Sequence, residues 1–266
     1  MLNLKQWLGL DIKLDDTGKL ILPENVSCEK SSVRTANDAR NYFMDKNAKS
    51  SPDLYFMNQG ICAREDCAKI KAAGFRFDVT VIPAHMIGQE YIKTIGHIHP
   101  YKPGTKSRYA EIYEIINGEA LFILQKMNPS NSDIVEDVVV VRANRGEKAV
   151  MLPEYGHVTV NAGKEPLVMA DWVWADFKSE YEVYEKHHGA AYYVVNKNNQ
   201  IEFIPNKNYQ NLPRYRIAKP KSILEFAADF SKPMYQQGLE NNFKNLDFLK
   251  NPEKYREKLT AEYCYR

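Results

Sequence analysis

EYIKTIGHIHPYKPGTKSRYAEIYEIINGEALFILQ spans residues Glu90–Gln125 and combines strand-forming residues with two histidines and a glutamate inside an apolar run. Side chains alternate between the two faces of a strand, so His97 and His99 project from the same face. Glu111 follows in AEIYEI, and a carboxylate among aromatic and aliphatic side chains needs a partner or a cation. The segment therefore predicts β-structure that carries metal ligands.

A third imidazole follows in EKAVMLPEYGHVTVNAG. Pro153 and Gly156 predict a turn there, and His157 begins a new strand on which Thr159 and Asn161 share its face. Three neutral imidazoles and one carboxylate form a mixed nitrogen and oxygen ligand set. Such a set suits iron(II), manganese, nickel, cobalt or zinc, and the ligand types do not choose among these metals.

Some of these residues also have an interpretation in which they neither bind a metal nor take part in catalysis. For an H-x-H motif alone, a solvated pair of histidines is the alternative, because the spacing is common. Tyr113 shares the face of Glu111, whereas Glu114 falls on the opposite face, and we expect it to be an exposed strand carboxylate. The remaining histidines lie in turns or polar stretches, and we expect no role in the site for His85, His187 and His188.

The central part of the chain predicts a β-fold. Between Phe75 and about Val195, short runs rich in Val, Ile, Tyr and Phe are divided by Gly, Pro and Asn, which is typical of an antiparallel sandwich or barrel. The predicted strands are FRFDVTVIP, EYIKTIGHIH, AEIYEIIN, EALFILQK, DVVVVRA, KAVMLP, HVTVNAG, PLVMADWVW and AAYYVVN.

Helical patterns flank these strands. SSVRTANDARNYF and AREDCAKIKAAGF precede them, the second ending at Gly74, and SILEFAADF and NFKNLDFLKNPEKYREKLTAEY follow them. We therefore expect an N-terminal extension over residues 1–75 that packs on the barrel, a β-barrel domain over 76–204 and a C-terminal helical extension over 205–266.

The composition indicates a soluble globular protein, with 44% hydrophobic and 26% charged residues. No apolar run approaches the roughly 20 residues of a membrane helix, and Met1–Leu10 lacks the apolar core of a secretory signal. Basic and acidic residues are mixed along the chain, without the basic patch of a nucleic-acid-binding protein. We expect a cytoplasmic protein with no nucleic-acid or membrane partner.

The four cysteines are irregularly spaced, with no C-x-x-C pair. Neither a disulfide framework nor a cysteine zinc site is therefore expected. We expect reduced thiols at Cys28, Cys62, Cys67 and Cys264, with Cys62 and Cys67 packing in the interior.

The motifs resemble those of the cupins. The matching residues are His97, His99, Glu111, Gly118, Gly146, Pro153, His157 and Asn161. Cupins generally place the glutamate only a few residues after the second histidine, so PYKPGTKSRYA is expected to form a longer loop. The block from about Gly74 to Tyr181 resembles the cupin-type, or archaeal-type, glucose-6-phosphate isomerases, and poorer likeness is expected at both ends of the chain. This resemblance implies an all-β core, a double-stranded β-helix or jelly-roll-like barrel, with helical extensions at both ends.

The resemblance also implies an activity, the interconversion of glucose 6-phosphate and fructose 6-phosphate in glycolysis and gluconeogenesis. One divalent metal ion per subunit is implied, with iron(II) expected first, and its ligands are His97, His99, Glu111 and His157. Positions that match substrate-binding residues are Thr80, Thr94 and Gly96 for the phosphate, and Tyr109, Tyr113 and Tyr181 for the sugar. Glu111 and Tyr109 are the candidate catalytic residues, and a homodimer is expected by analogy with the fold.

Strand alternation and two departures from the family pattern modify what the resemblance implies. Strict alternation turns Thr94 and Gly96 away from the two histidines, so we expect a kink at Gly96. Val173 and Ser179 stand where some family members carry a tyrosine and a histidine, so recognition of the sugar ring or its opening is expected to differ.

Both the mechanism and the function have alternatives. Glu111 is expected to move a proton between C1 and C2 through a cis-enediol, and a metal-assisted hydride shift is the alternative. A cupin of different chemistry, such as an iron dioxygenase, would need oxygen. A third class is a non-catalytic sugar-phosphate-binding cupin, and the intact set of four ligands argues against it.

Overall fold

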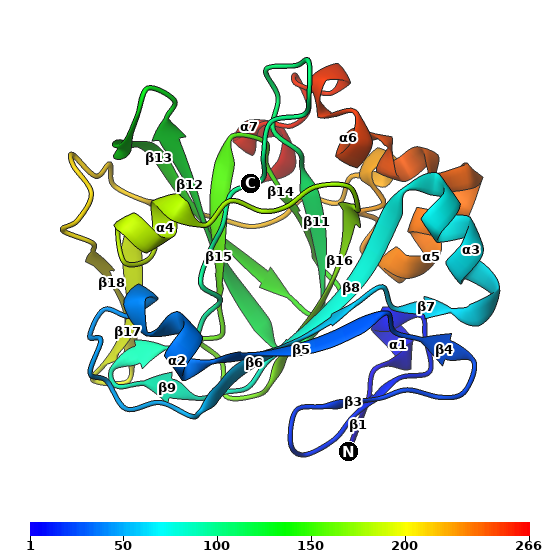
Figure 1. The fold of residues 1–266 in the computed structure, drawn as a ribbon, viewed down its shortest axis with the longest axis horizontal. Helices are drawn as coiled ribbons and strands as arrows, with labels where there is room; N and C mark the ends of the chain where they lie inside the picture. Colours follow the sequence, from blue (N-terminus) through cyan, green and yellow to red (C-terminus); the bar gives the residue numbers. More distant parts are fainter.

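Strands rich in Val, Ile, Tyr and Phe form two sheets that curve toward each other in the computed structural model, which describes residues 1–266 (Figure 1). Every pairing in the larger sheet is antiparallel. Its order is β14 (Lys148–Met151), β11 (Glu111–Asn117), β16 (Leu167–Trp174), β8 (Phe75–Ile82), β6 (Asp53–Gln59) and β5 (Lys30–Thr35). The opposite sheet has the order β15 (Tyr155–Val160), β12 (Glu119–Asn128), β13 (Asn131–Asn144) and β19 (Arg216–Ala218). The predicted all-β core is therefore confirmed.

Smaller sheets extend this core. One has the order β18 (Gln200–Pro205), β17 (Tyr192–Lys197), β10 (Glu90–Tyr91) and β9 (Met86–Ile87). The others are β1 (Leu2–Asn3) with β2 (Lys13–Leu14) and β3 (Leu20–Ile21), and β4 (Val26–Ser27) with β7 (Cys62–Ala63).

Short helices lie before and after the strands. The α-helices are α1 (Lys5–Leu8), α2 (Ala36–Ala39), α3 (Arg64–Ala73), α4 (Glu182–Lys186), α5 (Met234–Leu239), α6 (Asp247–Lys250) and α7 (Ala261–Cys264). The 3-10 helices are η1 (Arg40–Tyr42), η2 (Leu224–Phe226), η3 (Glu240–Leu246) and η4 (Pro252–Lys254). Not one of these helices has the length and apolarity to cross a membrane.

Only one of the predicted helices forms as expected, and the others form in part or in separate pieces. Helix α3 ends at Gly74 as expected, because Gly74 takes the left-handed conformation. In SSVRTANDARNYF the first residues form β5, and Thr35 then caps the four-residue α2. SILEFAADF forms only η2, because Ala227 has a φ of 54° and ends the turn. The last predicted helix is broken into η3, α6, η4 and α7, and α5 was not predicted.

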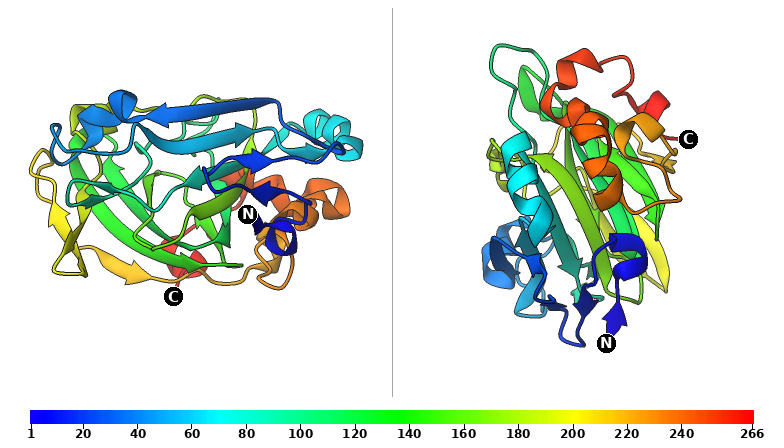
Figure 2. Two further views of the ribbon diagram at one scale, coloured as in Figure 1. Left: turned by 90° about the horizontal axis from the view of Figure 1, so that it is seen from below. Right: turned by 90° about the vertical axis from the view of Figure 1, so that its right-hand side faces the viewer.

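Strands β5 and β6 were not predicted either. They belong to the first 75 residues, yet β6 pairs with β8, so the larger sheet crosses the expected boundary at residue 75. Figure 2 shows β5 (blue) running alongside the sheet and the C-terminal helices (orange to red) lying outside the strands.

Glu114 is a correction. We expected an exposed carboxylate, but its side chain is completely buried. The C-terminal segment covers this outer face of the sheet, where the main-chain N–H of Met234 donates to Glu114 at 2.7 Å and the indole of Trp172 donates to the carbonyl of Met234 at 3.1 Å. Alternation gave the correct face of β11 but not what covers it.

The cysteines are a second correction. Cys62 and Cys67 form a disulfide, so the expectation of reduced thiols is wrong for this pair. The turn from β7 into α3 brings their Cα atoms to 5.4 Å, within the range that a disulfide spans. Cys28 and Cys264 are free.

Candidate metal centre

Four side chains converge inside the barrel, with one ligand atom from each lying within 4.8 Å of the others: His97, His99, Glu111 and His157. Oε2 of Glu111 lies 3.4 Å from Nε2 of His99 and 3.3 Å from Nε2 of His157. Nε2 of His97 lies 3.2 Å from Nε2 of His99. His97 is half-buried and the other three residues are buried.

The chemistry of this cluster fits a divalent metal ion. Oε2 of Glu111 and both ring nitrogens of His157 are buried and have no hydrogen-bond partner in the protein. Buried polar atoms without partners are costly, and native proteins rarely leave several of them together. Three imidazoles and one carboxylate offer the nitrogen and oxygen ligands that a first-row divalent ion takes.

A kink at Gly96 places His97 in the cluster. Gly96 has a φ of 80°, and a Cβ atom there would lie 2.5 Å from Val158 and 2.6 Å from Tyr184. Only glycine satisfies both the conformation and the space. The regular strand that we expected over residues 90–99 is therefore limited to β10, and a single bridge then pairs His97 with His157.

His99 is oriented by its other ring nitrogen. Nδ1 lies 3.1 Å from the main-chain carbonyl of Tyr109. A carbonyl only accepts, so this contact places the proton on Nδ1 and leaves the lone pair of Nε2 facing Glu111. The loop after His99 thus fixes the tautomer that a metal ligand requires.

The protonation states also suit a cation. Burial lowers the pKa of His97 well below its ordinary value, and the neighbouring His157 and His99 lower it further. Burial likewise lowers the pKa of His157, although Glu111 acts against it. Burial alone would raise the pKa of Glu111, but the imidazoles of His157 and His99 hold it well below its usual range. These shifts favour neutral imidazoles at His97 and His157 and an ionised carboxylate at Glu111.

Two further buried carboxylates, Asp78 and Asp171, interact with Glu111, and the sequence analysis did not identify them. Burial raises the pKa of Asp171 well above its ordinary value, and the charges of Glu111 and Asp78 add to the effect. Asp78 is the cross-strand neighbour of Asp171 and accepts hydrogen bonds at 2.9 Å from Arg76 and from the main chain of Gly60. The signal was present, because both aspartates stand inside apolar strands, as Glu111 does.

A cavity of about 80 Å³ adjoins the cluster and contains most of the predicted substrate-binding residues. The predicted residues in its lining are Thr80, Thr94, Gly96, Tyr113 and Tyr181, next to His97 and His157. Arg34, Tyr55 and Thr159 also line it and were not predicted to do so. The kink at Gly96 brings Thr94 and His97 to the same space, as we expected.

Tyr109 is the exception among the predicted residues, since it is not part of this lining. Its ring stacks on Phe177, with centroids 4.9 Å apart, and Phe177 in turn packs 4.6 Å from His99. The ring of Tyr109 therefore packs next to His99 through Phe177, and the main-chain carbonyl of Tyr109 contacts Nδ1 of His99.

The two departures from the family pattern lie close to the cluster. Val173 is buried and is the cross-strand partner of Glu111 on β11. Ser179 lies beside the hydroxyl of Tyr181, which is 37% exposed and stands at the mouth of the cavity.

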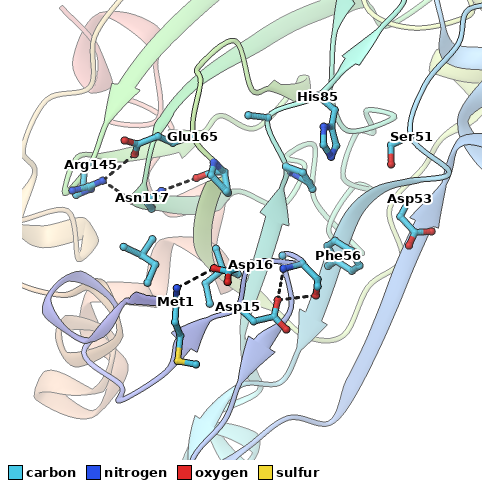
Figure 3. Close-up of a pocket in the computed structure, with 17 residues that line it drawn as sticks. Met1, Asp15, Asp16, Ser51, Asp53, Phe56, His85, Asn117, Arg145 and Glu165 are labelled. Carbon is cyan, nitrogen blue, oxygen red and sulfur yellow. Dashed lines mark hydrogen bonds and ion pairs between the residues drawn. The ribbon is translucent and has the colours of Figure 1, made fainter.

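The other histidines lie elsewhere. Nδ1 of His187 lies 2.9 Å from the carbonyl of Asn208, and Nδ1 of His188 lies 3.0 Å from that of Asn41. His85 lines a larger surface cavity of about 860 Å³ beside the N-terminal strands (Figure 3). This larger cavity shares no residue with the cluster, and several of its charges are already paired, as in Arg145 with Glu165 and Met1 with Asp16.

Comparison with solved structures finds distant likeness to cupin-fold enzymes of oxalate. An oxalate oxidase in complex with glycolate has a TM-score of 0.30 and 15% identity, covering 60% of this chain and 54% of the other. Oxalate decarboxylase from Bacillus subtilis has a TM-score of 0.32 and 14% identity, covering 50% of this chain and 28% of the other. Similarity at this level supports no statement about the reaction.

Comparison of sequences is more specific. Glucose-6-phosphate isomerase of Thermococcus kodakarensis is 28% identical over 212 residues, covering 77% of this chain and 98% of the relative. Glucose-6-phosphate isomerase of Pyrococcus furiosus is 27% identical over 188 residues, covering 68% of this chain and 89% of the relative. The family profile described as glucose-6-phosphate isomerase (GPI) matches residues 30–214, which is more than half of the chain. With this match, the chain belongs to the glucose-6-phosphate isomerase family.

Proposed function

We propose that this protein is a metal-dependent aldose–ketose isomerase that interconverts glucose 6-phosphate and fructose 6-phosphate. The observation that carries the proposal is the adjacency of two features. Four metal-ligand atoms lie within 4.8 Å of one another, and the cavity beside them is lined by Thr80, Thr94 and Gly96. The cavity thus joins a metal centre to hydroxyl and backbone donors of the kind that bind phosphate.

In this proposal His97, His99, Glu111 and His157 hold one divalent metal ion, and we propose iron(II). When bound, the metal supplies Lewis acidity toward the oxygens on C1 and C2 of the sugar. Imidazole ligands suit iron as well as zinc, nickel and cobalt, and metal analysis of the purified protein tests the choice of iron.

Residues of the chain transfer the proton, stabilise the developing oxyanion and orient the sugar. Glu111 is ionised and moves the proton between C1 and C2 through a cis-enediol, provided that it is free to reach the substrate. Tyr113 lies on the face of Glu111 and lines the cavity, where its hydroxyl can donate to a developing oxyanion. Tyr181 stands at the mouth and orients the sugar.

Assembly and location are further parts of the proposal. The reaction belongs to glycolysis and gluconeogenesis, so we propose a cytoplasmic enzyme. β5 is an edge of the larger sheet and all six of its residues are exposed or half-buried. Open strand edges commonly pair, so we propose a homodimer.

Dialysis against a chelator tests the function. We expect a coupled fructose 6-phosphate assay to lose its signal after dialysis and to regain it when one divalent metal is added back, under anaerobic conditions. Dependence on oxygen would instead indicate an oxygenase. Binding of the sugar phosphate without turnover, with every metal tried, would indicate a binding protein. His157→Ala should lose both metal and turnover, whereas His85→Ala, at an exposed position, should lose neither.

A further inference from the structure

Arg34 brings a positive charge to the cavity and forms no ion pair there. It lies on β5, directly opposite Tyr55 on β6, and lines the cavity together with Tyr55. Its Nε is buried and makes no hydrogen bond, and the guanidinium forms no ion pair. Asp38 favours the charged form of Arg34 from beyond ion-pair distance, and its Oδ2 accepts hydrogen bonds from the main chain and hydroxyl of Thr35, at 3.0 and 2.7 Å.

The cavity contains no carboxylate that would balance this charge, and the polar neighbour of Arg34 in the lining is the hydroxyl of Tyr55. No aspartate or glutamate is among its lining residues. Arg34 is half-buried, but a buried N–H group such as its Nε is costly without a partner, so its retention in a cavity suggests that a ligand completes it.

The neighbouring groups are donors too. The hydroxyl of Thr94 accepts from the main chain of Thr159 at 3.0 Å, so its own proton remains free to donate. The hydroxyl of Thr80 and the N–H of Gly96 take part in no hydrogen bond of the structure. Three donors and one cation face a space with no anion of its own.

We propose that Arg34 is the cation of the phosphate-binding end of the cavity and selects phosphorylated over unphosphorylated sugar. A guanidinium suits this task, because its fork of N–H groups matches two phosphate oxygens. The inference rests on the proposed function for the identity of the sugar, whereas the anion site stands on the geometry alone. It also gives the N-terminal part of the chain a direct contact with substrate, although the metal ligands all lie between residues 97 and 157.

Arg34 also touches Tyr55, whose hydroxyl lies 3.5 Å from the main-chain N–H of Ile95. A purely structural Arg34 would hold Tyr55 and the segment before Gly96 in place. Such a role would affect phosphorylated and unphosphorylated ligands alike. A role in binding phosphate affects only the former, and this difference is what the experiment measures.

The experiment compares Arg34→Gln and Arg34→Lys with the metal-loaded wild type. Titration calorimetry with inorganic phosphate reports on the anion site, titrations with fructose and with fructose 6-phosphate compare the unphosphorylated and phosphorylated sugar, and steady-state kinetics with fructose 6-phosphate report on substrate. We expect Arg34→Gln to weaken phosphate binding and raise KM roughly 10- to 100-fold, with kcat changed less than about threefold. Arg34→Lys should recover part of the loss, because it keeps the charge without the fork. Higher salt should weaken binding more in wild type than in Arg34→Gln.

Arg40→Gln is the matched control. Arg40 is exposed, six residues further along, and donates to the carbonyl of Lys46. We expect wild-type phosphate binding and KM, and all variants should retain the metal content and unfolding midpoint of wild type.

Unchanged phosphate binding in Arg34→Gln would overturn the inference. So would an equal loss of affinity for fructose and for fructose 6-phosphate, because that result indicates a structural role. If wild type binds phosphate through Arg34 but does not isomerise fructose 6-phosphate, the proposed function fails and the anion site stands. Should Arg34→Gln not fold, the comparison of Arg34→Lys with Arg40→Gln decides the question through the size of KM.

Discussion

The ammonium group of Lys148 lies 2.7 Å from the carboxylate of Glu114, and neither side chain is exposed. Lys148 also donates to the main-chain oxygens of Gly146 and Lys232, at 3.0 and 2.8 Å, and Glu114 accepts from the N–H of Met234. This pair therefore ties strands β11 and β14 to the C-terminal segment that covers them.

Removal of one partner should destabilise the fold. We expect Lys148→Met to lower the free energy of unfolding by about 3–5 kcal/mol, because it leaves a buried carboxylate unpaired. Burial raises the pKa of Glu114 to about 7, although Lys148 acts against it. Without Lys148 the folded state favours protonated Glu114 even more, so the destabilisation should be smaller at pH 5 than at pH 8. Urea unfolding at both values measures it.

The control for this prediction is the surface pair of Lys126 and Glu136, 3.4 Å apart and about one-third exposed or more. Lys126→Met should cost less than about 1 kcal/mol. Equal losses for the two lysine variants would show that the buried pair contributes no more than a surface pair.

The two tyrosines near the metal centre should behave differently. Tyr113 lines the cavity, whereas Tyr109 stacks on Phe177 outside its lining. We expect Tyr113→Phe to lower kcat/KM roughly 10- to 100-fold, the effect of losing one hydrogen bond to a developing charge, and Tyr109→Phe to change it less than about threefold. A larger loss in Tyr109→Phe would support the catalytic role that the family resemblance implies for Tyr109. Steady-state kinetics in both directions give the answer.

The metal-free protein should lose stability in mild acid. Burial holds the pKa of His157 below its ordinary 6.5 in the folded state. As the pH falls through 6.5, the unfolded chain takes up a proton that the folded chain refuses, so the stability that is present above 6.5 is lost below it. The loss is at most about 1.4 kcal/mol per pH unit for this residue.

Urea unfolding of chelator-treated protein at pH 7.5 and 5.5 measures this effect. His157→Asn should lose less stability between the two values than wild type. His85→Asn, at an exposed position, should lose as much as wild type. If all three proteins lose the same amount, His157 is not a source of the acid sensitivity.

The disulfide should be detectable by thiol counting. We expect two free thiols among four cysteines in denaturant without reductant, and four after reduction. Cys62→Ser should lower the free energy of unfolding by about 2 kcal/mol, the entropy of closing a short loop. Cys28→Ser should change it little. Four reactive thiols in the unreduced protein would contradict the pairing.

The strands and the four clustered side chains were predictable because their signals are local. Alternation along a strand has a period of two, so it indicates which side chains share a face wherever the chain is extended. His97, His99 and Glu111 were identified in this way, and the kink at Gly96 followed from the need to reconcile Thr94 with them. Asp78 and Asp171 carry the same local signal, a buried carboxylate inside an apolar strand.

By itself, the sequence determined the β-core and the set of candidate ligands, since these depend on neighbours along the chain. Tertiary structure alone decided that Glu114 is buried, that Tyr109 lies outside the cavity and that Arg34 enters it. Each of these depends on which distant segment covers a given face, and such pairings are selected by the total burial and hydrogen bonding of the folded chain, which no local pattern encodes.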